Sequence, residues 1–185
     1  MALSNMTIGI AGAGGIGSNV ARHLVQAGMT RLRIVDFDRV ETSNLNRQFY
    51  TIDQVGRPKV ECLKENLEKI SPCACVEPVL KRINPGDCLD LFRNCGLVVE
   101  GVDDAAAKKH LVEEMASAGI PVVSASGIAG LDMDTIRTRK IGQCHIVGDF
   151  STDVDGAVLF APKVAVIAAL MAGIVINERC KGNEI

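Results

Sequence analysis

The sequence has no tryptophan and one tyrosine, and aromatic residues make up only 3% of its 185 residues. Proteins that bind single-stranded nucleic acids commonly stack the bases on aromatic side chains within a positively charged groove. The formal net charge here is −2, whereas nonspecific binding of nucleic acids depends on an excess of Lys and Arg. We therefore expect no nucleic acid among the partners of this chain.

The sequence also lacks the C-x-x-C pairs that bind structural zinc. Its seven cysteines are odd in number and irregularly spaced, and no signal peptide precedes them, which favours reduced thiols and a cytoplasmic location. The spacing of Cys73 and Cys75 does not suit zinc, and the three histidines are scattered. Cys144 or Cys180 could accept sulfur or link transiently to a partner, but a buried or incidental thiol is the simpler interpretation.

Short apolar runs alternate with amphipathic segments along the first two thirds of the chain. This order predicts an α/β, Rossmann-like fold with a mostly parallel sheet and flanking helices. Two further strands at 134–141 and 144–147 predict an antiparallel C-terminal extension. The other expected strands are 75–80, 97–101 and 121–125, and the other expected helices are 58–70, 87–92 and 105–118. With 48% hydrophobic residues, a chain of this length is expected to form a single domain.

The N-terminal part reads as a nucleotide-binding βαβ unit. Residues 6–11 form an apolar strand, 12–17 a glycine-rich loop, 18–27 a helix and 32–35 a second strand that ends at Asp36. An acid about 20 residues beyond such a loop usually holds a ribose hydroxyl. The sequence therefore predicts that a nucleotide binds at the end of the first strand.

The loop contains Gly12, Gly14, Gly15 and Gly17. Glycines allow the backbone to approach a phosphate closely, and the following helix N-terminus supplies N–H donors and a positive dipole. Two plainer interpretations remain: the glycines serve only close packing of strand and helix, or Asp36 is a helix cap or loop acid.

Polar and basic residues follow the second strand, namely Asp38, Ser43, Asn44, Arg47 and Lys59. The glycines alone would suit a dinucleotide, but these residues indicate bound ATP whose α-phosphate is attacked. Arg offers a planar fork to phosphate oxygens and Lys a point charge. Solvated surface charges are the alternative interpretation of Arg47 and Lys59.

These motifs resemble the ThiF/MoeB/HesA family, whose members are related to the ubiquitin-activating enzymes. The resemblance is carried by the loop 12–17, V-D-F-D at 35–38, S-N-L-N-R-Q at 43–48, Lys59 and Asp103. Its motifs are specific through about Asp103. The chain length and the segments 127–130, 148–149 and 161–164 are most similar to the short ThiF branch.

The resemblance implies an enzyme that binds ATP and Mg²⁺ and adenylates the C-terminal glycine of a ubiquitin-like sulfur carrier. It implies that Asp36 holds the ribose, that Ser43, Asn44 and Arg47 hold the phosphates, that Lys59 contacts the β- and γ-phosphates, and that Asp103 binds Mg²⁺. Arg47, Lys59 and Asp103 are the expected catalytic residues. Asp38 and Asp104 complete the expected nucleotide site with the four loop glycines.

Two departures from the family pattern affect these expectations. Relatives usually have Asn after the Mg²⁺-binding Asp, where this chain has Asp104. Many relatives also carry a leading segment whose Arg reaches the partner subunit's ATP, and we expect that group to be missing here. Either Asp103 or Asp104 could instead cap the helix that begins near Ala105.

The C-terminal half, residues 126–185, is expected to receive the partner's tail and to form a dimer interface, whereas 1–125 binds the nucleotide. The alternating segment 134–141 contains Arg137, Arg139 and Lys140, which suit an acidic partner or protect a solvated edge strand. The acidic segment 149–156 is a candidate lid or partner loop.

The segment 164–176 is apolar all round. It is too short and too close to Lys163 for a membrane span to be expected. A helix of the core or of a dimer interface is expected instead, and the homodimers common among relatives favour an interface.

The leading hypothesis is an ATP-dependent adenylyltransferase that activates the C-terminal glycine of a ThiS-like sulfur carrier for thiamine biosynthesis. Within the same fold, the substrate could be the carboxylate of a molybdopterin sulfur carrier or one linked to tRNA. An NAD-dependent oxidoreductase would leave Arg47 and Lys59 without an obvious role. An inactive module that docks a ubiquitin-like carrier is the remaining alternative.

Overall fold

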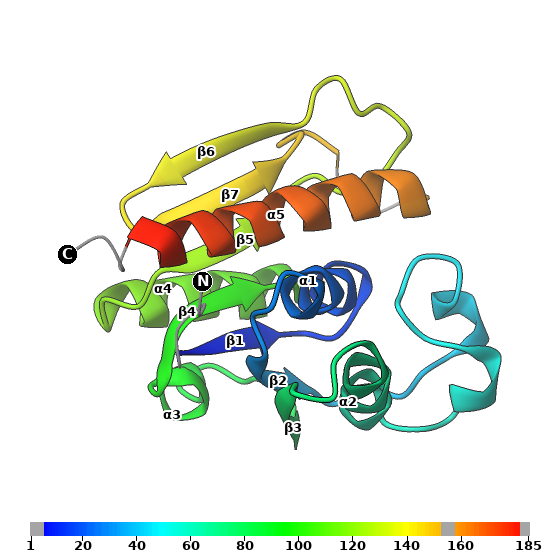
Figure 1. The fold of residues 1–185 in the computed structure, drawn as a ribbon. Coiled ribbons are helices and arrows are strands. Elements are labelled where there is room, and N and C mark those ends of the chain that lie inside the picture. The colour runs from blue at the N-terminus through cyan, green and yellow to red at the C-terminus, as the bar shows by residue number, and fades with distance from the viewer. Residues whose placement is uncertain (1–5, 153–157, 182–185) are drawn as a thin grey trace.

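The computed structural model describes residues 6–152 and 158–181. Its seven strands form one sheet in the order β3-β2-β1-β4-β5-β7-β6 (Figure 1). Strand β6 pairs antiparallel with β7, and the other neighbours pair in parallel. This confirms the prediction of a Rossmann-like, mostly parallel sheet with an antiparallel C-terminal extension.

The strands match the sequence periodicity closely. They are β1 (Thr7–Ala11), β2 (Arg31–Asp36), β3 (Cys75–Leu80), β4 (Cys95–Glu100), β5 (Val122–Ala125), β6 (Arg137–Ile141) and β7 (Cys144–Gly148). Strand β6 is shorter than the alternating segment 134–141 because Asp134 belongs to a turn, where its N–H donates to Asp132 Oδ1 at 2.9 Å.

The helices also lie where apolar periodicity predicts them. They are α1 (Gly15–Gln26), α2 (Lys59–Ile70), α3 (Cys88–Phe92), α4 (Ala105–Ser117) and α5 (Ala161–Lys181), with 3₁₀ turns at Thr42–Asn44 and Ile52–Gln54. Helix α1 begins at Gly15, so the last glycines of the loop form its first turn rather than preceding it. Helix α5 continues past the predicted end at 176.

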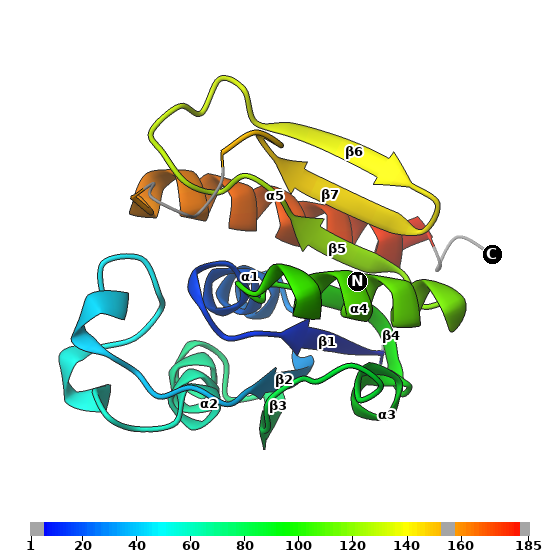
Figure 2. The same cartoon turned by 180° about the vertical axis from the view of Figure 1, so that it is seen from behind.

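Helices cover both faces of the sheet, α1, α2 and α5 on one face and α3 and α4 on the other (Figures 1 and 2). Alternate strand residues supply the two cores because successive side chains point to opposite faces. Ile8 and Ile10 of β1 pack in the cluster with α1, α2 and α5, whereas Ala11 packs in the cluster with α3 and α4.

Within the described ranges 6–152 and 158–181, α5 is the one helix that is long enough and apolar enough to cross a membrane, judged by length and composition alone. Core helices of other proteins meet the same criteria, so this is weak evidence. Val164, Ile167, Met171 and Val175 are buried in the cluster shared with α1. The helix therefore packs against the domain along one side.

The strand order reverses direction between β1 and β4, and ligands of such sheets bind beyond the carboxyl ends of the strands at this point. The glycine loop lies there. Gly12 has φ +86°, a conformation that side chains disfavour, and a Cβ at Gly17 would overlap the Gly12 carbonyl oxygen. These two glycines allow the turn from strand to helix to close tightly beside β4.

Candidate functional site

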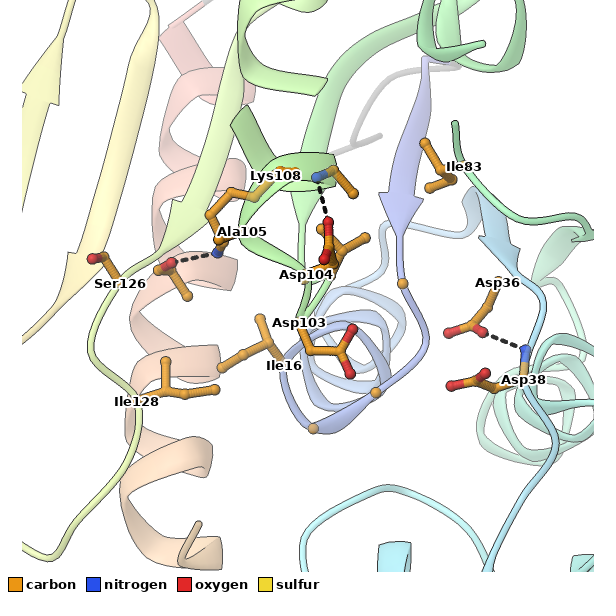
Figure 3. Close-up of a pocket in the computed structure, with 18 of the residues that line it drawn as sticks. Ile16, Asp36, Asp38, Ile83, Asp103, Asp104, Ala105, Lys108, Ser126 and Ile128 are labelled. Carbon is orange, nitrogen blue, oxygen red and sulfur yellow. Dashed lines mark hydrogen bonds between the residues drawn. The ribbon is translucent and has the colours of Figure 1, made fainter. Parts of the chain in front are cut away.

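A cavity of about 790 Å³ opens at the carboxyl ends of the strands (Figure 3). It is lined by nine of the residues expected to bind nucleotide or metal: Gly12, Gly14, Gly15, Asp36, Asp38, Arg47, Lys59, Asp103 and Asp104. Gly17, Ser43 and Asn44 are not among the described residues that line it. The fold thus gathers residues from widely separated segments at one edge of the sheet.

The two ends of the cavity have different chemistry. Figure 3 shows Asp36 and Asp38 on one side and Ser126 and Ile128 on the other, with Asp103 between them. The first side carries the carboxylates and cations expected around a nucleotide. A reaction between a nucleotide and a second substrate would therefore take place near Asp103.

Asp36 is buried and its orientation is set by the backbone. Its Oδ2 accepts from the Ala13 N–H at 2.5 Å, and its Oδ1 accepts from the Asp38 N–H at 2.7 Å. Burial raises the pKa of Asp36 above its ordinary value, although the two backbone hydrogen bonds oppose that shift. The residue holds the glycine loop against the end of β2, in addition to any contact with a ribose.

Ser43 and Asn44 make local contacts. Asn44 Oδ1 accepts from the Glu41 N–H at 3.1 Å, and the Ser43 hydroxyl donates to Glu41 Oε2 at 3.1 Å. Together with Glu41, Asn44 forms a capping box around the 3₁₀ turn Thr42–Asn44. In this structure both residues shape the turn that leads to Arg47.

Arg47 lies across the N-terminus of α1. Its aliphatic stem passes over Gly15, where an added Cβ would lie 3.8 Å from Arg47 Cγ. Its Nη1 donates to the Ser43 carbonyl at 3.0 Å and to Asn46 Oδ1 at 2.8 Å. The positive charge of Arg47 therefore adds to the positive end of the helix dipole. The guanidinium and the helix N-terminus together form an anion-binding arrangement.

Lys59 contributes a second cation to the cavity wall. Its side chain is only 7% exposed, and its Nζ donates to Asp38 Oδ2 at 2.9 Å. A buried ammonium group needs such a partner because burial of an unpaired charge is costly. Lys59 is thus held in the cavity rather than solvated at the surface.

Asp103 and Asp104 occupy the loop between β4 and α4. Asp104 Oδ1 accepts from the Ala107 N–H at 2.7 Å, so Asp104 is the N-cap of α4. The neighbouring Asp103 lines the cavity without that role. The unusual acid at position 104 therefore has a structural function that Asn would also serve.

A group of three or more acidic, His or Cys side chains suited to a metal is absent from the part of the chain that the structure describes. A single carboxylate fits Mg²⁺ in nucleotide sites, where substrate phosphates and water supply most ligands. Asp103 suits that requirement because it lies between the two ends of the cavity.

A buried polar network behind Asp103 was not predicted from the sequence. Glu100 is fully buried at the end of β4, where its Oε2 accepts from the Ser124 hydroxyl at 2.6 Å and from Lys108 Nζ at 2.7 Å. Its Oε1 accepts from the Val102 N–H at 2.8 Å. A charged residue inside the apolar run 97–101 was the available signal. The network ties the Asp103 loop to β5 and α4.

The far side of the cavity is largely apolar and is held by a buried ion pair. Lys163 Nζ donates to Asp149 Oδ2 and to the Ala129 carbonyl, each at 2.6 Å. Burial would raise the pKa of Asp149, but hydrogen bonds from Lys163, Thr152 and Ser151 outweigh it and hold that pKa well below its ordinary value. The predicted loop 149–156 is anchored at its start, and 153–157 lie outside the described residues.

Strand β6 presents the basic side chains predicted for the C-terminal half. All its residues are exposed, including Arg137, Arg139 and Lys140. The guanidinium of Arg139 lies 4.4 Å from the ring centre of Phe150, which lines the cavity. This positive edge therefore adjoins the far end of the cavity.

The structure shows no activated thiol at Cys88, Cys95 or Cys144. Burial raises the pKa of Cys144, raises that of Cys95 to about 11 and raises that of Cys88 to about 12. A raised pKa disfavours the thiolate, which is the nucleophilic form. Cys144 therefore has the environment of a structural thiol.

Comparison with curated proteins finds adenylyltransferases and dehydratases. The chain is 31% identical over 178 residues to the molybdopterin-synthase adenylyltransferase of Escherichia coli, covering 92% of this chain and 72% of that protein. It is 34% identical over 143 residues to the adenylyltransferase and sulfurtransferase UBA4 of Yarrowia lipolytica, covering 77% and 36%. Over 129 residues it is 38% identical to tRNA threonylcarbamoyladenosine dehydratase 2 of Saccharomyces cerevisiae, covering 68% and 29%. The chain thus spans about a third of the last two proteins.

Solved structures share the fold. The E. coli tRNA N6-threonylcarbamoyladenosine dehydratase in complex with AMP has a TM-score of 0.88 at 20% identity, covering 96% of this chain and 87% of that one. E. coli MccB with ATP has a TM-score of 0.79 at 24% identity, covering 97% and 56%. The ThiF family profile matches residues 1–180, and with the relatives above this shows that the chain belongs to the ThiF family.

Proposed function

We propose that this protein is an ATP-dependent adenylyltransferase that activates the C-terminal carboxylate of a ubiquitin-like sulfur carrier, with a ThiS-like carrier as its substrate. One observation carries the proposal. A single cavity joins Asp36, the N-terminus of α1, Arg47 and Lys59 to a second, apolar end. The family membership supports ATP as the nucleotide.

The reaction transfers AMP from ATP to a carboxylate and releases pyrophosphate. The attacking oxygen belongs to the substrate, so the protein needs no nucleophilic side chain. It must bring two anionic groups together and stabilise the charge that moves to pyrophosphate. Arg47, Lys59 and the N-terminus of α1 supply positive charge for this purpose, and catalysis would come from positioning and electrostatics.

Mg²⁺ is the metal that this chemistry calls for, and Asp103 is the residue that would hold it. Bound there, the ion would neutralise phosphate charge. The two carboxylates that neighbour Asp103 along the chain have other partners, since Asp104 caps α4 and Glu100 binds Lys108.

The cations argue against the oxidoreductase alternative. Arg47 is placed at the helix N-terminus and Lys59 is buried in the cavity wall. A dinucleotide site of the usual kind relies on backbone N–H groups for its pyrophosphate. Two added cations suit the larger charge of a triphosphate better.

The partner side of the cavity suits a flexible peptide end. Gly127 and Ile128 line the cavity beside Phe150, and the basic strand β6 adjoins it. Two of the relatives above are a molybdopterin-synthase adenylyltransferase and an adenylyltransferase and sulfurtransferase. We infer that β6 receives an acidic carrier whose tail reaches Asp103.

We propose further that the protein forms a homodimer through α5. Its outward face contains Val166 and Leu170, which are 39% and 43% exposed. Such apolar exposure along a helix favours contact with a second helix of the same kind. Light scattering should give twice the monomer mass, and Leu170→Glu should give the monomer; a wild-type protein that stays monomeric would reject this interface.

A second candidate substrate is a carboxylate linked to tRNA. Two relatives named as tRNA threonylcarbamoyladenosine dehydratases are 38% and 35% identical to this chain, in yeast and in Bacillus subtilis. The same nucleotide site would then activate a modified adenosine. The exposed basic residues of β6 would contact the RNA backbone in this case.

The test compares substrates directly. Purified protein, ATP and Mg²⁺ are incubated with a ThiS-like carrier, a MoaD-like carrier or tRNA bearing threonylcarbamoyladenosine, and adenylated product is detected by mass spectrometry. A carrier that lacks its terminal glycine is the control. We expect adenylation of the ThiS-like carrier only when that glycine is present. Turnover of the tRNA alone would reject the carrier proposal.

A further inference from the structure

Arg47 lies on the long loop between β2 and α2. The backbone N–H of Lys59 donates to the Asp38 carbonyl at 2.9 Å, and Arg39 forms a β-bridge with Pro58. These contacts close the base of the loop. They leave the position of Arg47, near its middle, to be set by other contacts.

Asn19, on the second turn of α1, makes one of these contacts. Its Nδ2 donates to the Gly15 carbonyl at 2.7 Å and to the Arg47 carbonyl at 2.9 Å. The residue is 7% exposed. One buried amide group therefore joins the backbone of Arg47 directly to the glycine loop.

Two neighbouring side chains repeat this pattern. The Ser18 hydroxyl donates to the Gly14 carbonyl at 2.7 Å and accepts from the Phe49 N–H at 3.1 Å. The Tyr50 hydroxyl donates to the Ala13 carbonyl at 2.7 Å, and burial raises the pKa of Tyr50 well above its ordinary value. The donor therefore stays protonated across the physiological pH range.

These contacts bind three consecutive carbonyls, those of Ala13, Gly14 and Gly15. In a trans peptide the carbonyl and the following N–H point in opposite directions. Fixing each carbonyl beneath the loop therefore directs the next N–H away from the contact. Those N–H groups belong to Gly14, Gly15 and Ile16, all of which line the cavity.

We propose that Asn19 and Tyr50 are positioning residues for the nucleotide phosphates: they align the N–H groups of the glycine loop and place Arg47 beside them. The inference rests on the proposed ATP site. Neither side chain is among the described residues that line the cavity, so each acts through the groups it holds. Loss of either contact should weaken binding of phosphate and spare binding of the base and ribose.

The test measures the affinities of ATP and of adenosine by calorimetry for wild type, Asn19→Ala and Tyr50→Phe. Tyr50→Phe removes one oxygen and keeps the ring, so it decides the matter if Asn19→Ala does not fold. We expect ATP affinity to fall about tenfold, a typical cost of one lost hydrogen bond to a buried group. Adenosine affinity should stay within about twofold of wild type.

Cys88→Ala is the matched control. Cys88 is 1% exposed in α3, in the core on the opposite face of the sheet, so its truncation destabilises the fold away from the cavity. Its melting temperature should fall while both affinities remain at the wild-type value. Equal losses of ATP and adenosine affinity in Asn19→Ala or Tyr50→Phe would show a merely structural role and overturn the inference.

A double-mutant cycle with Arg47→Ala tests whether Asn19 acts through Arg47. If Asn19 acts through Arg47, the effect of Asn19→Ala on ATP affinity should largely disappear in the Arg47→Ala background. Full additivity would overturn that link. A wild-type protein that binds no ATP would reject the proposed function itself, whereas ATP binding that is unchanged in both variants would reject only this inference.

Discussion

Lys59 and Asp38 are joined twice, once through their side chains and once through their backbones. The Lys59 ammonium lies 2.9 Å from Asp38 Oδ2, and the Lys59 N–H donates to the Asp38 carbonyl at the same distance. The double contact orients a buried cation in the cavity wall and also closes the loop that carries Arg47. Nucleotide binding and loop geometry therefore depend on the same pair.

Lys59→Met should weaken ATP binding by about tenfold or more, because a charge-assisted hydrogen bond contributes about 1.5–3 kcal/mol. Isothermal titration calorimetry measures this loss. Lys64→Met is the control, since Lys64 lies on the same helix with a side chain that is 40% exposed and paired with Glu68. Unchanged ATP affinity in Lys59→Met would contradict the role assigned to this cation.

Asp103 and Asp104 should respond differently to the same substitution. Asp103→Asn should remove the gain in ATP affinity that Mg²⁺ provides without weakening metal-free binding, because the substitution removes the metal ligand but no group that attracts phosphate. Asp104→Asn should keep both properties, since Asn is also a good N-cap. Titrations of ATP with and without Mg²⁺ measure the difference. Loss of the Mg²⁺ effect in Asp104→Asn alone would reverse the assignment.

Asp149→Asn should reduce stability in a pH-dependent way. At neutral pH the variant leaves Lys163 buried without its counter-charge, a loss of about 3–5 kcal/mol in the free energy of unfolding. The pKa of Asp149 is lowered in the folded state from an ordinary value of 3.8. Its contribution is therefore present above that value and is lost as the pH falls below it.

Urea unfolding at about pH 7, 5 and 3 measures this dependence. The difference between wild type and Asp149→Asn should be largest at neutral pH and should shrink at the most acidic point. Asp90→Asn, whose side chain is 78% exposed, should match wild type at neutral pH. A difference that grows as the pH falls would contradict the buried ion pair.

Much of the fold could be predicted because local patterns specify it. The strand at 75–80 was predicted with its observed bounds, and the paired strands near the C-terminus follow from the alternating segment that contains Arg137 and Arg139. The gathering of Gly12, Asp36 and Asp103 was predictable for a topological reason. Asp36 ends a parallel strand and Gly12 and Asp103 follow one, and the carboxyl ends of parallel strands meet at one edge of the sheet.

The support of the site was not predictable in the same way. Asn19 contacts Arg47 across 28 positions and Tyr50 contacts Ala13 across 37. No local spacing rule predicts either pair, because the contacts depend on how the loop between β2 and α2 folds back onto α1. Ser43 and Asn44 make local capping contacts that a short-range pattern can specify, and the phosphate roles that the family resemblance implies for them stay predictions.

The most direct test of the central claim is exchange of labelled pyrophosphate into ATP, measured with Mg²⁺ and a ThiS-like carrier that ends in Gly-Gly. Exchange reports reversible formation of the acyl adenylate. We predict exchange that requires the carrier's terminal glycine and that Arg47→Ala abolishes without loss of the folded state. Exchange that persists in Arg47→Ala and Asp103→Ala, or absence of exchange from wild type that binds ATP and the carrier, would contradict the account.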